Sequence, residues 1–322
     1  MDTSRVSFKS SRLQGADLPT FISMWLSDHE LQYAQSTHDS YRQAMDQFLA
    51  YWGKRQKPPM DSLLVKQYAR DLKWRHRSAA YLQRQLSVLR SFCGWAVDQN
   101  LLPSNPTTKT PLPKLSSEYC REALDETEAI RLLASIPVKN LFGLRDLLLV
   151  SLILRAGTRL IELNRANVGD FVRKEKVGLL YLQGKGREAN DSFVVLVPDL
   201  ADLMEKYLSL RGSPRPGSAL FISNKRSCKG GRLSVRGIQN IITGYLKKAG
   251  LKRARVVAYS LRHAAATIAL QNGADLKAVQ DMMRHASIST TQKYVHLNRR
   301  IEDGAEHRIP VRMKVELSSL GL

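Results

Sequence analysis

The stretch LRDLLLVSLILRAG, Leu144–Gly157, is almost wholly apolar. A helix that is hydrophobic on every side belongs in a protein core, so we predict a buried helix here. A charged side chain, Arg159, follows directly at its end. Burying an unpaired arginine is unfavourable, so Arg159 needs either an acidic partner or an anionic ligand.

The chain around this helix shows further regular elements. Asp125 and Glu128 have the spacing of a helix capping box. Two β-rich runs around a polar turn, within residues 178–198, predict a hairpin. Apolar spacing predicts further helices over 235–251, 261–274, 275–285 and 287–297. The helix over 261–274 is expected to stop at Gly273.

The first half of the chain is helical by the same criterion. Apolar and aromatic residues recur at helical spacing within 18–31, 36–55, 61–75 and 78–99. Ser36 or Thr37 is the expected cap of the second helix. We expect the tryptophans and tyrosines of these helices to lie in the core. A stretch with four prolines, residues 101–117, then predicts an extended linker.

These patterns predict a mainly α protein of two domains, with a small β-sheet in the second. We expect a flexible N-terminus, a helical domain, a linker, a mixed but mostly helical domain and a C-terminal tail, over residues 1–17, 18–102, 103–120, 121–300 and 301–322.

Composition points to a polyanionic partner. The chain has 322 residues, with 50 Lys and Arg against 29 Asp and Glu, a net charge of +21. Nucleic acid is the first candidate partner, and an acidic membrane surface is the second. No apolar run is long enough to span a bilayer, and no secretory signal is visible. The three cysteines are odd in number and widely spread, as in a reducing compartment. We therefore expect a cytoplasmic, nucleoid-associated protein without membrane contacts.

Several chemistries are excluded by spacing. His285 and His296 are too far apart to form a zinc site on adjacent turns, and no cysteine is near them. Carboxylates are too scarce for a two-metal nuclease. The chain also lacks a Walker loop and the nucleophile elbow of a serine hydrolase. We therefore expect no metal and no nucleotide cofactor.

The second half instead carries cations beside small or apolar residues: Arg159, Lys185, Arg262 and His285. Two guanidiniums can clamp a phosphodiester, while lysine and histidine can move protons. A tyrosine hydroxyl such as that of Tyr294 could attack phosphorus and store the bond energy in a phosphotyrosyl link. The same tyrosine could also be an ordinary packed residue.

The motifs AGTRLIEL, QGKG, LRHAAAT and MRHASISTTQKYVH follow one another within residues 156–296. In this order and spacing, the second half resembles the catalytic domain of tyrosine recombinases, the phage integrase family. The helical first half resembles the family's core-binding domain. The resemblance covers nearly the whole chain after residue 18.

The resemblance implies roles for individual residues. Arg159 and Arg262 would bind the scissile phosphate, and His285 would be a second phosphate ligand. Lys185 would be the general acid, although Arg187 could take its place. Tyr294 would be the nucleophile, and Glu162 would support the site. Alternatively, Arg159 and Glu162 could form an ion pair and no more.

The sequence departs from the family's pattern at three places. Tyr259 stands where the family usually has histidine, and a tyrosine can donate one hydrogen bond to the phosphate but cannot act as a base near neutral pH. Arg284 stands where glycine is common. The first 17 residues are too short for an arm-site domain, which points to a two-domain enzyme acting on short core sites.

The predicted function is site-specific recombination of duplex DNA through a 3′-phosphotyrosyl intermediate, as in integration, excision, resolution or transposition. Strand exchange implies a homo-tetramer on DNA. Accessory directionality factors are further candidate partners. The C-terminal tail, residues 301–322, is expected to dock on a neighbouring protomer. Type IB topoisomerase-like relaxation and a non-catalytic DNA-binding regulator are the alternatives. Candidate DNA contacts are Arg42, Arg84, Arg90, Arg187, Arg232 and Arg236.

Overall fold

The structure is a computed structural model, and it describes residues 18–30, 33–75, 78–113, 122–184, 190, 192–212, 214–225, 229–285, 287 and 291, the side chain of Ser36 excepted. The chain divides into two compact units, Met1–Glu118 and Tyr119–Leu322. Each unit has its own hydrophobic core. Among the described residues, no helix is both long enough and apolar enough to cross a membrane.

The described residues of unit one form four helices, as the apolar spacing predicted: α1 (Leu18–Glu30), α2 (Gln35–Gly53), α3 (Ser62–Trp74) and α4 (Ala79–Asp98). Side chains of Asp61 and Ser78 cap α3 and α4. The predicted cap at Ser36 or Thr37 is wrong. The second helix already begins at Gln35, after Ala34, and has no side-chain cap.

The core of unit one is aromatic, as the sequence indicated. Trp25, Phe48, Tyr68 and Phe92 are all buried. The ring of Trp25 meets that of Phe92 edge-on at 5.6 Å, and Phe48 meets Tyr68 in the same way at 5.2 Å. Edge-to-face pairs of this kind stabilise a core beyond the area that they bury. These rings hold the four helices together.

The segment after α4 packs on unit one instead of leaving it at once. Leu101 and Leu102 are buried in the same core, and Leu112 packs against it. The Arg90 guanidinium donates hydrogen bonds to the backbone oxygens of Thr107 and Thr110, at 3.1 and 3.0 Å. Residues up to about 112, which the sequence assigned to the linker, are therefore fastened to the helical unit.

Unit two is mostly helical. Its elements are α5 (Glu126–Ala134), α6 (Leu141–Ala156), α7 (Leu160–Arg165), the short 3-10 helix η2 (Val168–Asp170), β1 (Phe171–Lys174), β2 (Val177–Leu182), β3 (Ser192–Leu196), α8 (Pro198–Leu210), α9 (Val235–Lys248), α10 (Ala258–Gln271) and α11 (Leu276–Met283). The predicted capping box of Asp125 and Glu128 is present at the start of α5. Helix α10 ends just before Gly273, whose φ of 84° confirms the predicted stop.

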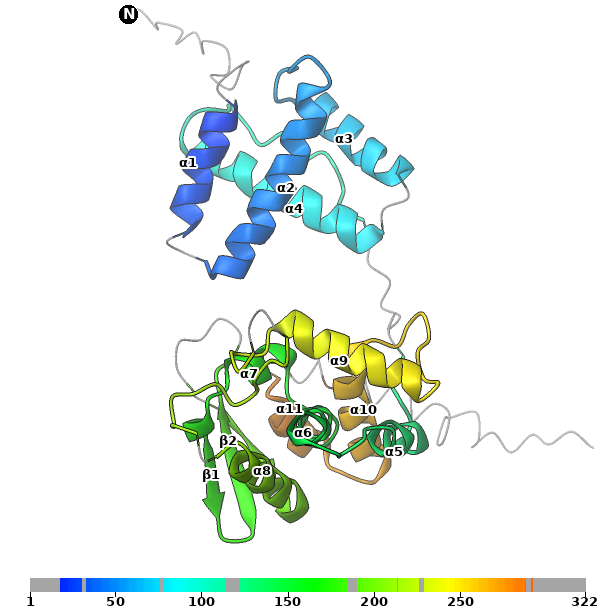
Figure 1. Ribbon diagram of the computed structural model, residues 1–322. Helices are drawn as coiled ribbons and strands as arrows, with labels where there is room; N and C mark the ends of the chain where they lie inside the picture. The colour runs from blue at the N-terminus through cyan, green and yellow to red at the C-terminus, as the bar shows by residue number, and fades with distance from the viewer. Residues whose placement is uncertain are drawn as a thin grey trace, which may run out of the picture. The chain divides into compact units, whose positions relative to one another are not determined.

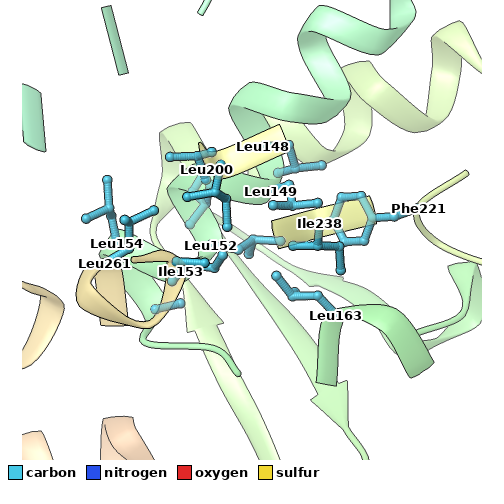
Figure 2. Packing of buried hydrophobic residues seen from close by; sticks show 14 of the residues in the cluster. Leu148, Leu149, Leu152, Ile153, Leu154, Leu163, Leu200, Phe221, Ile238 and Leu261 are labelled. Carbon is cyan, nitrogen blue, oxygen red and sulfur yellow. The ribbon is translucent and has the colours of Figure 1, made fainter. Parts of the chain in front are cut away.

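Helix α6 is the centre of this unit, and α5, α8 and α10 pack around it (Figure 1). Leucines and other aliphatic residues on several sides of α6 are buried, as its all-round hydrophobicity predicted. Figure 2 shows Leu148, Leu152 and Leu154 of α6 among Leu163, Leu200, Phe221, Ile238 and Leu261. The helix is capped by the Asn140 side chain at its start.

The sheet is a three-stranded antiparallel meander, ordered β1-β2-β3. The predicted hairpin is formed by β2 and β3, with Leu180 opposite Val194 and Leu182 opposite Ser192. Buried residues alternate along β2, as expected when one face of a strand packs on a core. The sequence did not predict β1, because four residues with a weak alternation carry too little signal.

Candidate active site

The chain reverses sharply where α6 ends. Gly157 has a left-handed conformation, with φ of 58°, which glycine adopts without strain. A Cβ at this position would lie 2.8 Å from Met283 Sδ, so the end of α11 approaches the backbone closely here. Arg159 follows as the N-terminal cap residue of α7. The turn therefore carries Arg159 to the junction of α6, α7 and α11.

Glu162 anchors Arg159 from one turn further along α7. Its carboxylate accepts hydrogen bonds from the Arg159 backbone N–H and from Arg159 Nη1, both at 2.7 Å. The Glu162 side chain is 0% exposed. Burial favours its neutral form, but Arg284 and Arg159 outweigh burial and hold the pKa of Glu162 below its usual value. Glu162 is therefore a buried carboxylate whose charge the neighbouring arginines maintain.

Arg262 reaches the same junction from α10. It is 1% exposed, and its guanidinium donates to the backbone oxygens of Gly157 and Met283. Burial, together with repulsion from Arg159, lowers the pKa of Arg262 to about 10. The side chain is thus still protonated near neutral pH. The two arginines that the motifs singled out are brought together, as the sequence suggested.

His285 follows α11 at this site. Its Nδ1 lies 2.9 Å from Thr291 Oγ1. Burial and the positive charges of Arg262, Arg159 and Arg284 lower the pKa of His285 to about 4, so the imidazole is neutral at physiological pH. Thr291 is buried and was not identified from the sequence. Its position, three residues before the predicted nucleophile, is the one feature of the sequence that could have marked Thr291 as a site residue.

Tyr259 lies on the first turn of α10, one turn before Arg262. It is half-buried, and its ring meets the His263 ring edge-on, with 4.5 Å between centroids. Tyr259 therefore lies one helical turn from Arg262, at the position where the family's pattern calls for histidine.

The predicted general acid and nucleophile, Lys185 and Tyr294, lie outside the described residues, as do Arg187 and the tail, 301–322. The described part of the site thus holds three guanidiniums, from Arg159, Arg262 and Arg284. The carboxylate of Glu162 neutralises part of their positive charge. This balance leaves positive charge for an anionic ligand.

The candidate DNA contacts differ in their surroundings. Arg42 and Arg236 are exposed, and Arg84 is exposed with one bond to the Ser40 backbone oxygen. Arg90 fastens the segment after α4, as described above. Arg232 donates to the backbone oxygens of residues 164–166 and to Asn167 Oδ1. These bonds give Arg90 and Arg232 a structural role within their units.

Comparison with known families gives two matches along the chain. Residues 122–300 match the model of the phage integrase family, and residues 28–100 match the phage integrase N-terminal SAM-like domain. The first match alone spans more than half of the chain. The chain belongs to the phage integrase family of tyrosine recombinases.

Curated relatives agree with this assignment. Tyrosine recombinase XerC of Proteus mirabilis is 35% identical over 242 residues, which cover 74% of this chain and 76% of the relative. Tyrosine recombinase XerC of Pelotomaculum thermopropionicum is 30% identical over 247 residues, covering 74% of this chain and 77% of the relative. The family resemblance stated from the motifs is confirmed.

Solved structures share the fold. The XerH site-specific recombinase, in a post-cleavage complex with its palindromic difH substrate, has a TM-score of 0.71 and 22% identity, covering 84% of this chain and 79% of that one. A lambda integrase tetramer bound to a Holliday junction has a TM-score of 0.66 and 16% identity, covering 93% of this chain and 80% of that one. The predicted mainly α fold with a small sheet is confirmed.

The recombinase is therefore a site-specific DNA strand-transfer enzyme. The comparisons favour recombination over both alternatives, relaxation by a topoisomerase-like enzyme and regulation without catalysis. Their matches span both the helical unit and the unit that carries the arginines.

Proposed function

We propose that Arg159 and Arg262 bind the scissile phosphate and that Tyr294 attacks it. The observation that carries this proposal is the convergence of the two arginines. They come from α7 and α10, and both bind backbone oxygens at the junction with the end of α11. Arginines held in this way by backbone oxygens are preorganised for a phosphodiester, whose non-bridging oxygens gain charge in the transition state.

The proposed reaction is a pair of transesterifications. The Tyr294 phenol passes its proton to solvent, and its oxygen bonds to phosphorus while the bond from phosphorus to the 5′ oxygen breaks. Lys185 protonates that leaving oxygen. A free 5′ hydroxyl of another strand then attacks the 3′-phosphotyrosyl link and releases the tyrosine. One phosphoester bond forms for each that breaks, so no metal or nucleotide is required.

The surrounding residues support this assignment. A neutral His285 can donate or accept a hydrogen bond at the phosphate, and its bond to Thr291 fixes the chain three residues before Tyr294. Tyr294 follows three residues after Thr291 in the sequence. In this proposal, Tyr259 donates one neutral hydrogen bond to the phosphate, and Glu162 orients Arg159.

At the level of the whole chain, we assign residues 18–102 to a core-binding domain and residues 121–300 to the catalytic domain. Both would contact duplex DNA, because the positive charge is spread over both halves of the sequence. The lambda integrase has been solved as a tetramer on a Holliday junction, and a DNA-bound tetramer is the assembly that we propose here. The tail, 301–322, is the segment proposed to dock on a neighbouring protomer.

Covalent trapping tests the proposed chemistry. DNA that is nicked close to the cleavage position loses its short leaving fragment by diffusion, so an attacked strand stays attached to the protein. The parent should give an adduct that survives a denaturing gel, and Tyr294→Phe should bind DNA equally well and give none. An adduct of normal yield from Tyr294→Phe would assign the nucleophile to another residue.

A further inference from the structure

Arg284 has a backbone conformation that arginine rarely adopts. It directly follows α11 with φ of 52° and ψ of 50°, in the left-handed region. A side chain with a Cβ is disfavoured there, and glycine is the usual choice. The sequence nonetheless places arginine at this position, so we expect the side chain to make interactions that offset the cost of this backbone conformation.

The Arg284 guanidinium is buried against the site. Its Nη2 lies 2.6 Å from Glu162 Oε2, and the same oxygen accepts the Arg159 backbone N–H. The other carboxylate oxygen, Oε1, binds Arg159 Nη1 at 2.7 Å. Glu162 is thus shared by two guanidiniums, one on each oxygen.

Arg284 also joins segments that are far apart in the sequence. Its guanidinium donates to the backbone oxygens of Met282, at 2.8 Å, and Gly157, at 3.3 Å. Its own backbone oxygen accepts a hydrogen bond from Arg159 Nη2 at 3.0 Å. The end of α11 is therefore tied to the loop after α6 and to the start of α7 through this residue.

The two arginines on Glu162 differ in their access to solvent. The Arg159 side chain is 29% exposed, the Arg284 side chain is 10% exposed, and Glu162 is fully buried. Arg159 is therefore the more accessible of the two guanidiniums that bind Glu162. A single carboxylate balances one positive charge, so Arg284 balances part of the charge of Glu162 and leaves that of Arg159 for the phosphate.

We propose that Arg284 is a positioning residue for the strand-transfer reaction. It shares Glu162 with Arg159 and thereby holds the Arg159 guanidinium in place for the scissile phosphate. It also leaves the positive charge of Arg159 only partly neutralised by Glu162. This inference rests on the proposed role of Arg159 as a phosphate ligand. Arg284 itself need not touch the DNA.

The test is the single-turnover rate of adduct formation on the nicked substrate. Arg284→Gly removes the guanidinium and leaves a residue that fits the left-handed backbone, so the variant should fold. Loss of the buried charged contacts should slow cleavage at least about tenfold, with DNA affinity nearly unchanged. Arg284→Lys keeps the positive charge but lacks the planar guanidinium with its several donors, and it should recover part of the rate.

A purely structural contribution is separated by a double-variant cycle. If Arg284 acts through Glu162, then adding Arg284→Gly to Glu162→Gln should change the rate less than about twofold. The matched control is Glu175→Gly, because Glu175 has a similar left-handed backbone, φ of 50°, but is exposed on the turn between β1 and β2. This control should cleave at the parental rate.

The inference is overturned if Arg284→Gly cleaves as fast as the parent, if Arg284→Lys is no faster than Arg284→Gly, or if the Arg284→Gly effect is undiminished in the Glu162→Gln background. Arg159→Ala, measured alongside, tests the proposed function separately. If Arg159→Ala is inactive while Arg284→Gly is normal, only the role of Arg284 fails. If Arg159→Ala cleaves normally, the proposed phosphate site fails as a whole.

Discussion

Tyr259 gives the sharpest prediction at the scale of a single residue. It lies one helical turn from Arg262, and its hydroxyl can supply one neutral hydrogen bond to a developing oxyanion. Such a bond is worth about 3 kcal/mol, on the order of a hundredfold in rate. Tyr259→Phe should therefore slow cleavage by this factor with little loss of DNA binding. Single-turnover cleavage of the two proteins measures the effect.

Replacement by histidine provides the companion measurement. Tyr259→His should keep or raise activity and make the rate depend on pH near the imidazole pKa of about 6.5. The competing view is that the ring packs against His263, 4.5 Å away, and has no part in chemistry. In that case the Phe variant would cleave like the parent and the His variant would be slower.

His263 predicts how stability changes with pH. Burial and the nearby His285 lower the pKa of His263 to about 4 in the folded protein, whereas the unfolded value is about 6.5. Between these values the unfolded chain binds a proton that the folded protein does not, so stability falls as pH decreases. From pH 7 to pH 5 the free energy of unfolding should drop by about 2 kcal/mol through this residue.

Urea unfolding of the parent and of His263→Leu at both pH values isolates this contribution. The variant lacks the titrating imidazole, so its free energy of unfolding should fall less over the same interval. Equal losses in the two proteins would show that His263 does not account for the acid sensitivity. Above pH 7 the imidazole is neutral in both the folded and the unfolded chain, so His263 should no longer change the free energy of unfolding with pH.

Sequence motifs found residues of the site and the Arg159–Glu162 ion pair, and they missed the contacts of Arg284 and Thr291. Arg159, Glu162, Arg262 and His285 stood out by residue type and spacing, and they meet in the structure. The role of Arg284 could not be read, because its partner Glu162 is 122 positions away in the chain. A motif records residue types along the chain, whereas a shared carboxylate is a property of the folded core.

At the scale of elements, the end of α6 is the most sensitive point. Gly157→Ala would force a left-handed backbone on a residue with a Cβ, which costs about 1–2 kcal/mol, and would press that Cβ against Met283. The free energy of unfolding should fall by at least this amount. Cleavage should also slow, because the Gly157 backbone oxygen is bound by both Arg262 and Arg284.

Gly250→Ala is the matched control for this change. Gly250 also has a left-handed conformation, with φ of 69°, but a Cβ there would meet no atom within 4 Å. It follows α9 and does not contact the site arginines in any described bond. We expect a similar loss of stability and an unchanged cleavage rate. Equal cleavage defects in both variants would attribute the Gly157 effect to general destabilisation.

Most elements with strong periodicity were predicted, but α8 was not, although its buried Leu200, Met204 and Tyr207 recur at helical spacing. The four helices of unit one, buried α6 and the hairpin of β2 and β3 follow directly from apolar spacing. Strand β1 is only four residues long. The segment after α4 reads as a linker because of its prolines, yet buried Leu101 and Leu102 and the bonds of Arg90 fasten it to unit one. Such tertiary contacts are invisible to local pattern.

At the scale of the whole molecule, the net charge of +21 predicts a strong dependence of DNA binding on salt. Each neutralised phosphate should contribute a slope of about −0.9 to the plot of log affinity against log salt concentration. With contacts from both units, the slope should be steep and linear. Fluorescence anisotropy with a labelled core site, across a salt series, measures it.

Separating the units provides the control for this prediction. Each unit expressed alone should bind DNA much more weakly and with a shallower slope, because it neutralises fewer phosphates. A slope of only about −1 to −2 for the intact chain would contradict binding through phosphate contacts from both units.

The proposed cleavage of DNA by joining Tyr294 to a 3′ phosphate can be tested by finding the bond itself. The trapped protein–DNA adduct is digested with protease and nuclease, and the remaining nucleotide-linked peptide is identified by mass spectrometry. We predict a nucleotide attached through its 3′ phosphate to the peptide that contains Tyr294. A link to any other residue, or to a 5′ phosphate, would contradict this mechanism.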